Sequence, residues 1–278
     1  MVRQPCHRDR VFTVACVFSR EEQANGNAHR AARRRTDRRP GVRRSALADR
    51  PLALAPGEYA GGLVKTVGPA LDVHAIEPID VVLLSHEHHS DNLDPGGREW
   101  LPRAGRVLTT IEGARRLGGN ATGLAPWSSI QLDRSSGPPV TVTAVPAQHG
   151  PDGTEHITGP VIGFLLAGPE LETVYVSGDN ASLDVVRAIA EHAGGVDVAV
   201  LHAGAVQLPH RFDGAYLTLS SERAAEAAKI LGARAVVPVH FEGWTHFTQG
   251  ADALRAAFAG NQLADRLALA EPGESVTV

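Results

Sequence analysis

Short apolar runs alternate with helical patterns from about residue 51 to the C-terminus. The runs are rich in Val, Ile and Leu, and Gly and Pro flank many of them, as is typical of buried strands. We predict strands at Val81–Ser85, Arg106–Thr110, Val140–Pro146, Val161–Leu166, Thr173–Ser177, Val196–Leu201 and Ala235–Val239. Strands that alternate with helices in this way favour an α/β fold.

Three Ala-rich stretches have an apolar residue at every third or fourth position, which predicts helices. These stretches are Leu183–His192, Ser221–Leu231 and Ala251–Phe258. Ser182 and Ser220 directly precede the first two, and a serine hydroxyl commonly caps a helix N-terminus. Because we find no repeat or linker, we expect residues 51–278 to form one domain.

The first 50 residues differ in character from the rest of the chain. They contain 13 Arg and five acidic residues, although the whole chain has a formal net charge of −4. The remaining chain is therefore acidic, which disfavours nucleic acid as its partner. Residues 21–50 show no apolar period, so we expect a solvated basic segment with little order. The alternative is an arm that binds nucleic acid or acidic lipid.

Two further features bear on the location of the protein. The apolar run Val11–Phe18 follows a basic start, but Arg20 and Glu21 come after it in place of a small-residue cleavage site. No apolar run approaches the roughly 20 residues that span a bilayer. We therefore expect a cytoplasmic protein without a membrane span.

Polar residues of the kinds that bind metals stand directly after five of the predicted strands. Their positions are His86, His88, His89 and Asp91 after the first strand, then His149, Asp179, His202 and His240. In α/β sheets, ligand sites collect beyond the carboxyl ends of strands, so these side chains are expected to converge. A single buried histidine is more often a hydrogen-bonded core residue, but several in one loop favour a metal site.

The expected donors are imidazole nitrogens and carboxylate oxygens, because Cys6 and Cys16 are the only cysteines and lie in the basic segment. Such donors suit Zn²⁺, whereas Mg²⁺ and Ca²⁺ prefer more oxygen. We expect one or two zinc ions, with Mn²⁺ or Fe²⁺ as alternatives.

At these residues, from about Gly57 onward, the chain resembles the metallo-β-lactamase superfamily. The usual signature of that superfamily is His-x-His-x-Asp-His, followed by a His, a bridging Asp and a final His. The chain looks most similar to the cytoplasmic metal-dependent hydrolases that include ascorbate-6-phosphate lactonases and phospholipase D-type phosphodiesterases. The resemblance implies a four-layer αββα sandwich with the metals at one edge, between two sheets.

Carried over by position, the resemblance implies two groups of ligands. The first metal would take His86, His149 and one or both of His88 and His89; the second would take Asp91 and His240, with Asp179 bridging the two.

The first motif departs from the signature in two ways. Asn92 follows His86 by six positions, where the signature has five. Either His86-x-His88 therefore matches the start of the signature, or His89-x-Asp91-Asn92 matches its end. Asn92 also stands where the last histidine is expected, and an amide oxygen is a poorer zinc ligand. The second site is therefore expected to be weak unless His89 supplies the missing nitrogen.

The resemblance also implies hydrolysis of a small ester, lactone or phosphodiester by a zinc-activated hydroxide. We expect Asp91 to orient the water and accept its proton, with His246 or His156 as the proton donor to the leaving group. Trp244 is a candidate pocket residue, and Glu87 and Glu242 are candidate orienting residues. Because Asn92 weakens the motif, the alternative is a non-catalytic metal-binding or interaction protein. The expected partner is a small-molecule substrate; the oligomeric state is not predicted.

The N-terminal segment lacks features that the superfamily usually carries. Nothing before Pro51 resembles its Gly-Gly-Pro-Thr-like strand or its Thr-Asp-Pro turn. The Arg, Ala, Pro and Gly bias of residues 25–50 is typical of an out-of-frame reading of a GC-rich gene. We therefore expect a misassigned start that leaves the N-terminal part of the fold incomplete; the other reading frames upstream of Gly57 test this.

Overall fold

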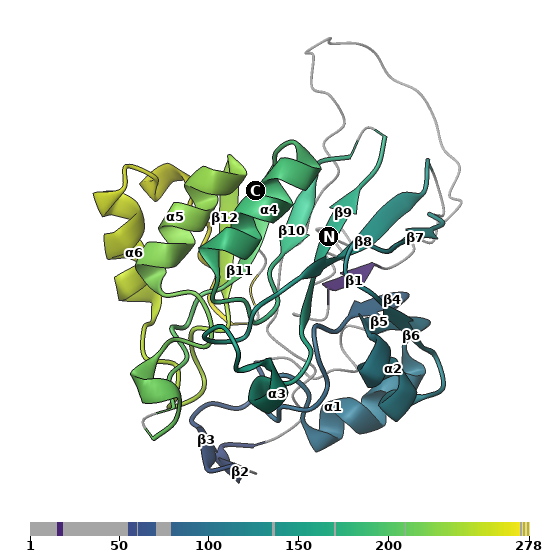
Figure 1. Ribbon diagram of the computed structural model, residues 1–278, viewed down its shortest axis with the longest axis horizontal. Helices are drawn as coiled ribbons and strands as arrows, with labels where there is room; N and C mark the ends of the chain where they lie inside the picture. The colour runs from purple at the N-terminus through teal and green to yellow at the C-terminus, as the bar shows by residue number, and fades with distance from the viewer. Residues whose placement is uncertain are drawn as a thin grey trace, which may run out of the picture.

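Two β-sheets pack face to face, and helices cover the outer face of each (Figure 1). The computed structural model describes residues 16–18, 55–59, 61–70, 79–134, 137–169, 171–208, 210–272, 274, 276 and 278. This arrangement is the four-layer αββα sandwich that the resemblance implies. The predictions about the basic segment and the misassigned start fall on residues outside those described, apart from the strand formed by residues 16–18.

The smaller sheet has the strand order β1-β4-β5-β6. Its strands are β1 (Cys16–Phe18), β4 (Val81–Leu83), β5 (Arg106–Thr110) and β6 (Ala121–Leu124). Strands β4, β5 and β6 are parallel, and β1 pairs antiparallel with β4. Two helices, α1 (Pro95–Trp100) and α2 (Ile111–Leu117), cover its outer face.

The larger sheet has the order β12-β11-β10-β9-β8-β7. Its strands are β7 (Ser129–Leu132), β8 (Val140–Pro146), β9 (Ile162–Ala167), β10 (Val174–Val176), β11 (Val198–His202) and β12 (Ala235–Val239). Its covering helices are α4 (Leu183–Ala193), α5 (Ser221–Leu231) and α6 (Ala251–Gly260). Because β10, β11 and β12 are parallel and β8 runs in the same direction, their carboxyl ends meet at one edge.

The inner strands of both sheets, such as β4, β11 and β12, are buried on both faces, which explains why they are continuously apolar in sequence. In β4, Val81 and Leu83 pack between the sheets with Phe164, whereas Val82 and the following Leu84 face the helical layer. The same alternation holds along β11 and β12.

Every predicted strand and helix is present, with ends within two residues of those expected. The predicted caps are confirmed: Ser182 Oγ accepts from the N–H of Val185, and Ser220 Oγ accepts from that of Arg223, both at 3.3 Å. The short elements were not predicted, because each has too few apolar positions to show a period. They are β1, β6, β7, α1, α2, α3 (Glu155–Thr158), the hairpin strands β2 (Gly57–Tyr59) and β3 (Leu63–Lys65), and single 3₁₀ turns at Leu101–Arg103, Phe212–Gly214 and Ala264–Arg266.

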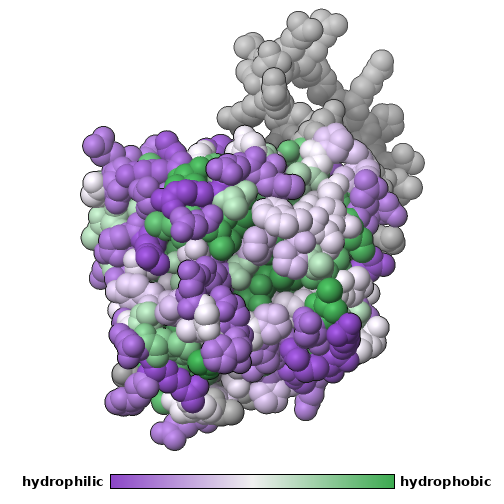
Figure 2. Space-filling view, in the orientation of Figure 1, coloured by the Kyte–Doolittle hydropathy of each residue, from purple (hydrophilic) through white to green (hydrophobic). Residues whose placement is uncertain are grey.

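Figure 2 shows hydrophilic residues over much of this side of the domain. Among the described residues, no helix is long and apolar enough to cross a membrane.

Candidate metal centre

The loop that follows β4 carries the histidine-rich motif and is fixed at both ends. At its far end Asp94 caps α1, since Asp94 Oδ1 accepts from the N–H of Gly97 at 2.6 Å. The side-chain amide of Asn92 donates to the backbone oxygen of His86, which folds the loop back on itself. Ser85 Oγ lies 2.9 Å from His86 Nδ1, so His86 presents Nε2 to the interior.

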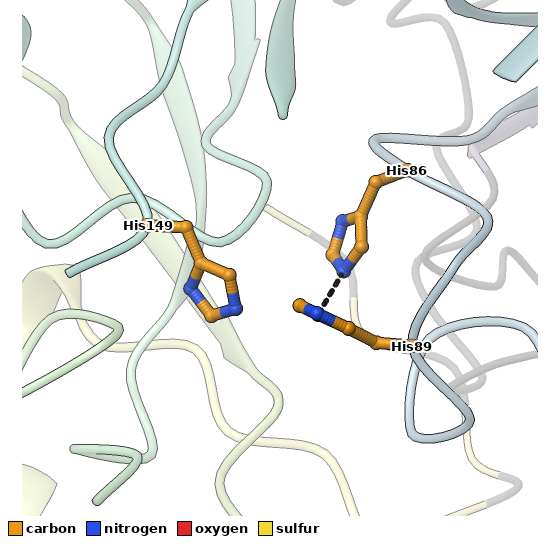
Figure 3. A group of neighbouring side chains, drawn as sticks. All are labelled: His86, His89 and His149. Atoms are coloured by element: carbon orange, nitrogen blue, oxygen red, sulfur yellow. Dashed lines mark hydrogen bonds between the residues drawn. The ribbon is translucent and has the colours of Figure 1, made fainter. Parts of the chain in front are cut away.

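Three imidazoles from two loops form the first group of candidate ligands. One nitrogen from each of His86, His89 and His149 lies within 4.8 Å of the others, and Figure 3 shows His149 facing the other two rings. His86 Nε2 is 3.1 Å from His89 Nδ1. His149 Nδ1 is 2.7 Å from the backbone oxygen of Leu217, which leaves its Nε2 for the centre.

Contacts between loops bring His149 next to Asp179. The side-chain oxygen of Asn180 accepts from the N–H of Gln148 at 3.0 Å, and the N–H of Ala181 donates to the Gln148 oxygen at 2.7 Å. These bonds tie the loop after β8 to the loop after β10. Asn180 could not be predicted from the sequence as a positioning residue, because its side-chain amide carries no metal-ligand signal.

Asp179 lies between the first group and a second group. Its Oδ2 is 3.8 Å from His86 Nε2 and 3.7 Å from His149 Nε2. Its Oδ1 is 3.5 Å from His240 Nε2 and 4.0 Å from His202 Nε2. Neither carboxylate oxygen has a hydrogen-bond partner among the described residues, although the side chain is only 1% exposed. A buried carboxylate without donors is costly unless a cation neutralises it.

The second group gathers around Asp91. Its Oδ2 is 3.6 Å from His240 Nε2 and 2.9 Å from His246 Nε2. Neither ring nitrogen of His240 has a hydrogen-bond partner among the described residues. In this second group of buried side chains, His240 therefore faces both Asp91 and Asp179, and His246 faces Asp91.

These donor sets fit a bound transition metal. Zinc bonds of about 2.0–2.2 Å place the ligand atoms of a tetrahedral site roughly 3.3 Å apart. The separations of 2.9–4.0 Å given above lie around that value. The unpartnered oxygens of Asp179 supply the negative charge that such an ion needs.

The titration states also fit metal binding. Burial lowers the pKa of His86 well below its usual range, and burial lowers the pKa of His89 to about 4. Burial alone would raise the pKa of Asp179, but His240 and His149 hold it below its usual range. Two imidazoles are therefore neutral and the carboxylate is ionised at neutral pH, as ligands must be.

His88 is turned away from the centre. Its Nε2 lies 2.8 Å from the backbone oxygen of Thr158, and its Nδ1 lies 3.8 Å from Glu87 Oε2. Although burial lowers the pKa of His88, Glu87 and the Thr158 oxygen raise it above its usual value. With both nitrogens facing acceptors, His88 has no lone pair directed at an ion. Of the two histidines that the sequence left open, the fold brings His89 to the first group.

Glu87 holds the motif loop in place and is not part of the candidate metal centre. Glu87 Oε1 accepts from Arg116 Nε at 2.5 Å, and its backbone oxygen accepts from Arg98 at 2.7 Å. Burial would raise the pKa of Glu87, but His88 and Arg116 lower it to about 2. The role of Glu87 as an orienting residue stays a prediction. Glu242 is exposed on the loop after β12.

Three other histidines and Trp244 differ in how deeply they are buried. His202, left out of the expected ligand set, is fully buried, with Nδ1 3.2 Å from Ser177 Oγ. Its place after a strand was the only signal in the sequence. His246 and Trp244 are buried near the centre. His156 is exposed on α3 and forms no ion pair with Asp91 or Asp179 in the described part of the chain.

Comparison with known proteins agrees with the fold and the motif. The sequence profile of the Beta-lactamase superfamily domain matches residues 60–241. The chain is 31% identical over 185 residues to a UPF0173 metal-dependent hydrolase of Methanosphaerula palustris, covering 64% of this chain and 75% of that protein. It is 29% identical over 199 residues to another from Methanocorpusculum labreanum, covering 68% of this chain and 80% of that one.

Solved structures share the fold at low sequence identity. An isothiocyanate hydrolase from Delia radicum gut bacteria superposes with a TM-score of 0.69 at 18% identity, covering 82% of this chain and 90% of that one. A metallo hydrolase of Ignicoccus hospitalis superposes with a TM-score of 0.59 at 19% identity, covering 81% and 96% of the two chains. The chain belongs to the β-lactamase superfamily, among its metal-dependent hydrolases.

Proposed function

We propose that this protein hydrolyses a small ester, lactone or phosphodiester with two metal ions, preferably zinc. His86, His89 and His149 would hold the first ion, and Asp91 and His240 the second. Asp179 would bridge the two. This is the ligand set expected from the sequence, with His89 taken from the pair His88 and His89 that the sequence left open.

The observation that carries the proposal is the position of Asp179. Its two oxygens face different groups of imidazoles, with Oδ2 toward His86 and His149 and Oδ1 toward His240. Both oxygens are buried and lack hydrogen-bond donors among the described residues. A carboxylate placed in this way can bind one ion with each oxygen.

When bound, zinc would polarise the scissile group and lower the pKa of water from 15.7 to about 7. Within the chain, Asp91 would orient the attacking water and accept its proton at the carboxylate. His246 would hold Asp91 in place, because its Nε2 lies 2.9 Å from Asp91 Oδ2. His156, which is exposed, has no part in this proposal.

The choice of zinc rests on the donors, since imidazole and carboxylate without thiolate suit zinc well. Iron suits the same donors. A diiron β-hydroxylase of Streptomyces venezuelae shares the fold with a TM-score of 0.50 at 19% identity, covering 72% of this chain and 45% of that one. We place the reaction in the cytoplasm, as the sequence predicts.

The test combines metal analysis with a substrate panel. The purified protein is expected to contain zinc and to turn over a p-nitrophenyl ester, a lactone or bis-p-nitrophenyl phosphate. His149→Ala should lose both metal and turnover. His192→Ala is the matched control, because His192 is exposed on α4 and stacks on Trp127. Bound metal without turnover on the panel would favour the non-catalytic alternative, and a lack of metal would contradict both.

A further inference from the structure

Asn92 leaves the second group one imidazole short of the superfamily signature. The amide nitrogen of Asn92 donates to the backbone oxygen of His86, so the side chain is engaged in shaping the motif loop. Asn92 is buried in that position. The second ion would therefore have only Asp91, His240 and the bridging Asp179 as ligands, unless another residue contributes.

We infer that His246 supplies the missing imidazole and binds the second ion through Nε2, together with Asp91 and His240. This inference rests on the proposed function and extends it to a residue outside the signature. His246 Nε2 lies 2.9 Å from Asp91 Oδ2, the same oxygen that lies 3.6 Å from His240 Nε2. The hydrogen bond between His246 and Asp91 thus joins two atoms that are close enough for one ion to bind both in its place.

The buried ring of His246 is directed at the centre through Nε2. The side chain is 7% exposed, and its Nδ1 has no hydrogen-bond partner among the described residues. Within the described part of the chain, the hydrogen bond of the ring is therefore with Asp91, at the centre.

The loop after β12 holds the His246 ring in place from several sides. The N–H of Thr245 donates to the Val64 oxygen at 3.0 Å, and the N–H of Gln207 donates to the His246 oxygen at 3.1 Å. The ring centroids of Phe247 and Trp244 lie 4.7 Å and 5.7 Å from that of His246. A ligand fixed before the ion arrives loses little entropy on binding.

His202 is the other buried imidazole near the second group, and its geometry fits less well. Its Nε2 is 4.0 Å from Asp179 Oδ1, whereas His246 Nε2 is 2.9 Å from Asp91 Oδ2. Its Nδ1 and its backbone N–H both lie against Ser177 Oγ, at 3.2 and 2.9 Å. His202 is therefore placed to support Asp179.

The inference is tested by counting bound ions. The metal-free full-length protein is titrated with Co²⁺, and the retained metal is measured by mass spectrometry after desalting. The wild type should retain two equivalents, His246→Ala one, and His192→Ala two. His246→Ala combined with Asn92→His should regain the second equivalent, because it restores the signature imidazole. Circular dichroism checks that each variant is folded, and His246→Gln is a smaller change should His246→Ala unfold.

Proton NMR of the Co²⁺ protein separates a ligand from a positioning residue. A histidine bound through Nε2 shows a strongly shifted, exchangeable Nδ1–H signal, and one such signal should vanish in His246→Gln. Two retained equivalents with every shifted signal present in the His246 variants would overturn the inference and leave the proposed function standing. A single equivalent in the wild type would also overturn the inference. No metal in the wild type would overturn the proposed function with it.

Discussion

Asp179 Oδ1 lies 3.5 Å from His240 Nε2, so the carboxylate that follows β10 faces the imidazole that follows β12. The two residues meet because β10, β11 and β12 are parallel neighbours whose carboxyl ends share an edge. Gly178 makes the turn before Asp179 possible: its φ is +57°, and a Cβ there would meet the Ile162 oxygen at 2.5 Å. The sheet thus positions both residues before any ion binds.

Asp179→Asn removes the bridging charge with little change of shape. The variant is expected to bind metal at least 10- to 100-fold more weakly than the wild type, by comparison with the loss of residues that only support metal ligands. Turnover of the panel substrates should fall with metal content. Isothermal titration with Zn²⁺ measures the affinity; an unchanged affinity would show that Asp179 binds no ion.

Gly159→Ala is expected to disturb His88. Gly159 has a φ of +75°, and a Cβ there would collide with His88 Nε2. Gly153→Ala is the matched control, because Gly153 has a φ of +80° with open space around it. The free energy of unfolding should fall by about 1–2 kcal/mol in both variants because of backbone strain. In Gly159→Ala it should fall by a further ~1–3 kcal/mol because of overpacking. Equal losses in urea unfolding would contradict the position given to His88.

The metal-free protein is expected to lose stability as the pH falls from about 6.5 toward 4. Burial, aided by His149 against the opposing effect of Asp91, lowers the pKa of His89 to about 4. In the unfolded chain His89 takes up a proton near pH 6.5, whereas in the folded chain it does so only near pH 4. Protonation therefore favours the unfolded chain as the pH falls through this range. His89→Gln should therefore flatten the fall of the unfolding free energy across this range. An equally steep fall in the variant would exclude His89 as a source of the pH dependence.

Metal binding is expected to stabilise the fold. A ligand at 100 times its Kd adds about 2.7 kcal/mol to the free energy of unfolding. For a domain of this size that raises the Tm by roughly 5–10 °C. Differential scanning calorimetry with and without Zn²⁺ measures the shift, and His149→Ala should abolish most of it. A Tm that does not respond to Zn²⁺ would contradict a preformed centre.

The sequence predicted an α/β fold because each main strand is a continuous apolar run bounded by turn residues, whereas the two-sheet sandwich was implied by the resemblance to the superfamily. It also predicted that His149, Asp179 and His240 converge, since each follows such a strand directly. The choice between His88 and His89 needed Thr158, a distant residue whose backbone oxygen draws His88 away. No local pattern carries that information.

The place of His246 was also beyond the sequence. The sequence offered His246 or His156 as the proton donor. It could not predict that His246 contacts Asp91, because the spacing of a loop histidine does not relate it to a motif far away in the chain. Its contact with Asp91 depends on the loop after β12 pairing with the β3 hairpin, through Val64 and Thr245. Hairpins this short leave no periodic pattern from which to predict them.

Crystallography of the zinc-loaded protein with anomalous scattering at the zinc edge tests the central claim most directly. Two peaks are predicted on either side of Asp179, one within about 2.2 Å of nitrogens of His86, His89 and His149, the other near Asp91 and His240. Zinc bound elsewhere, with no peak beside Asp179, would contradict it.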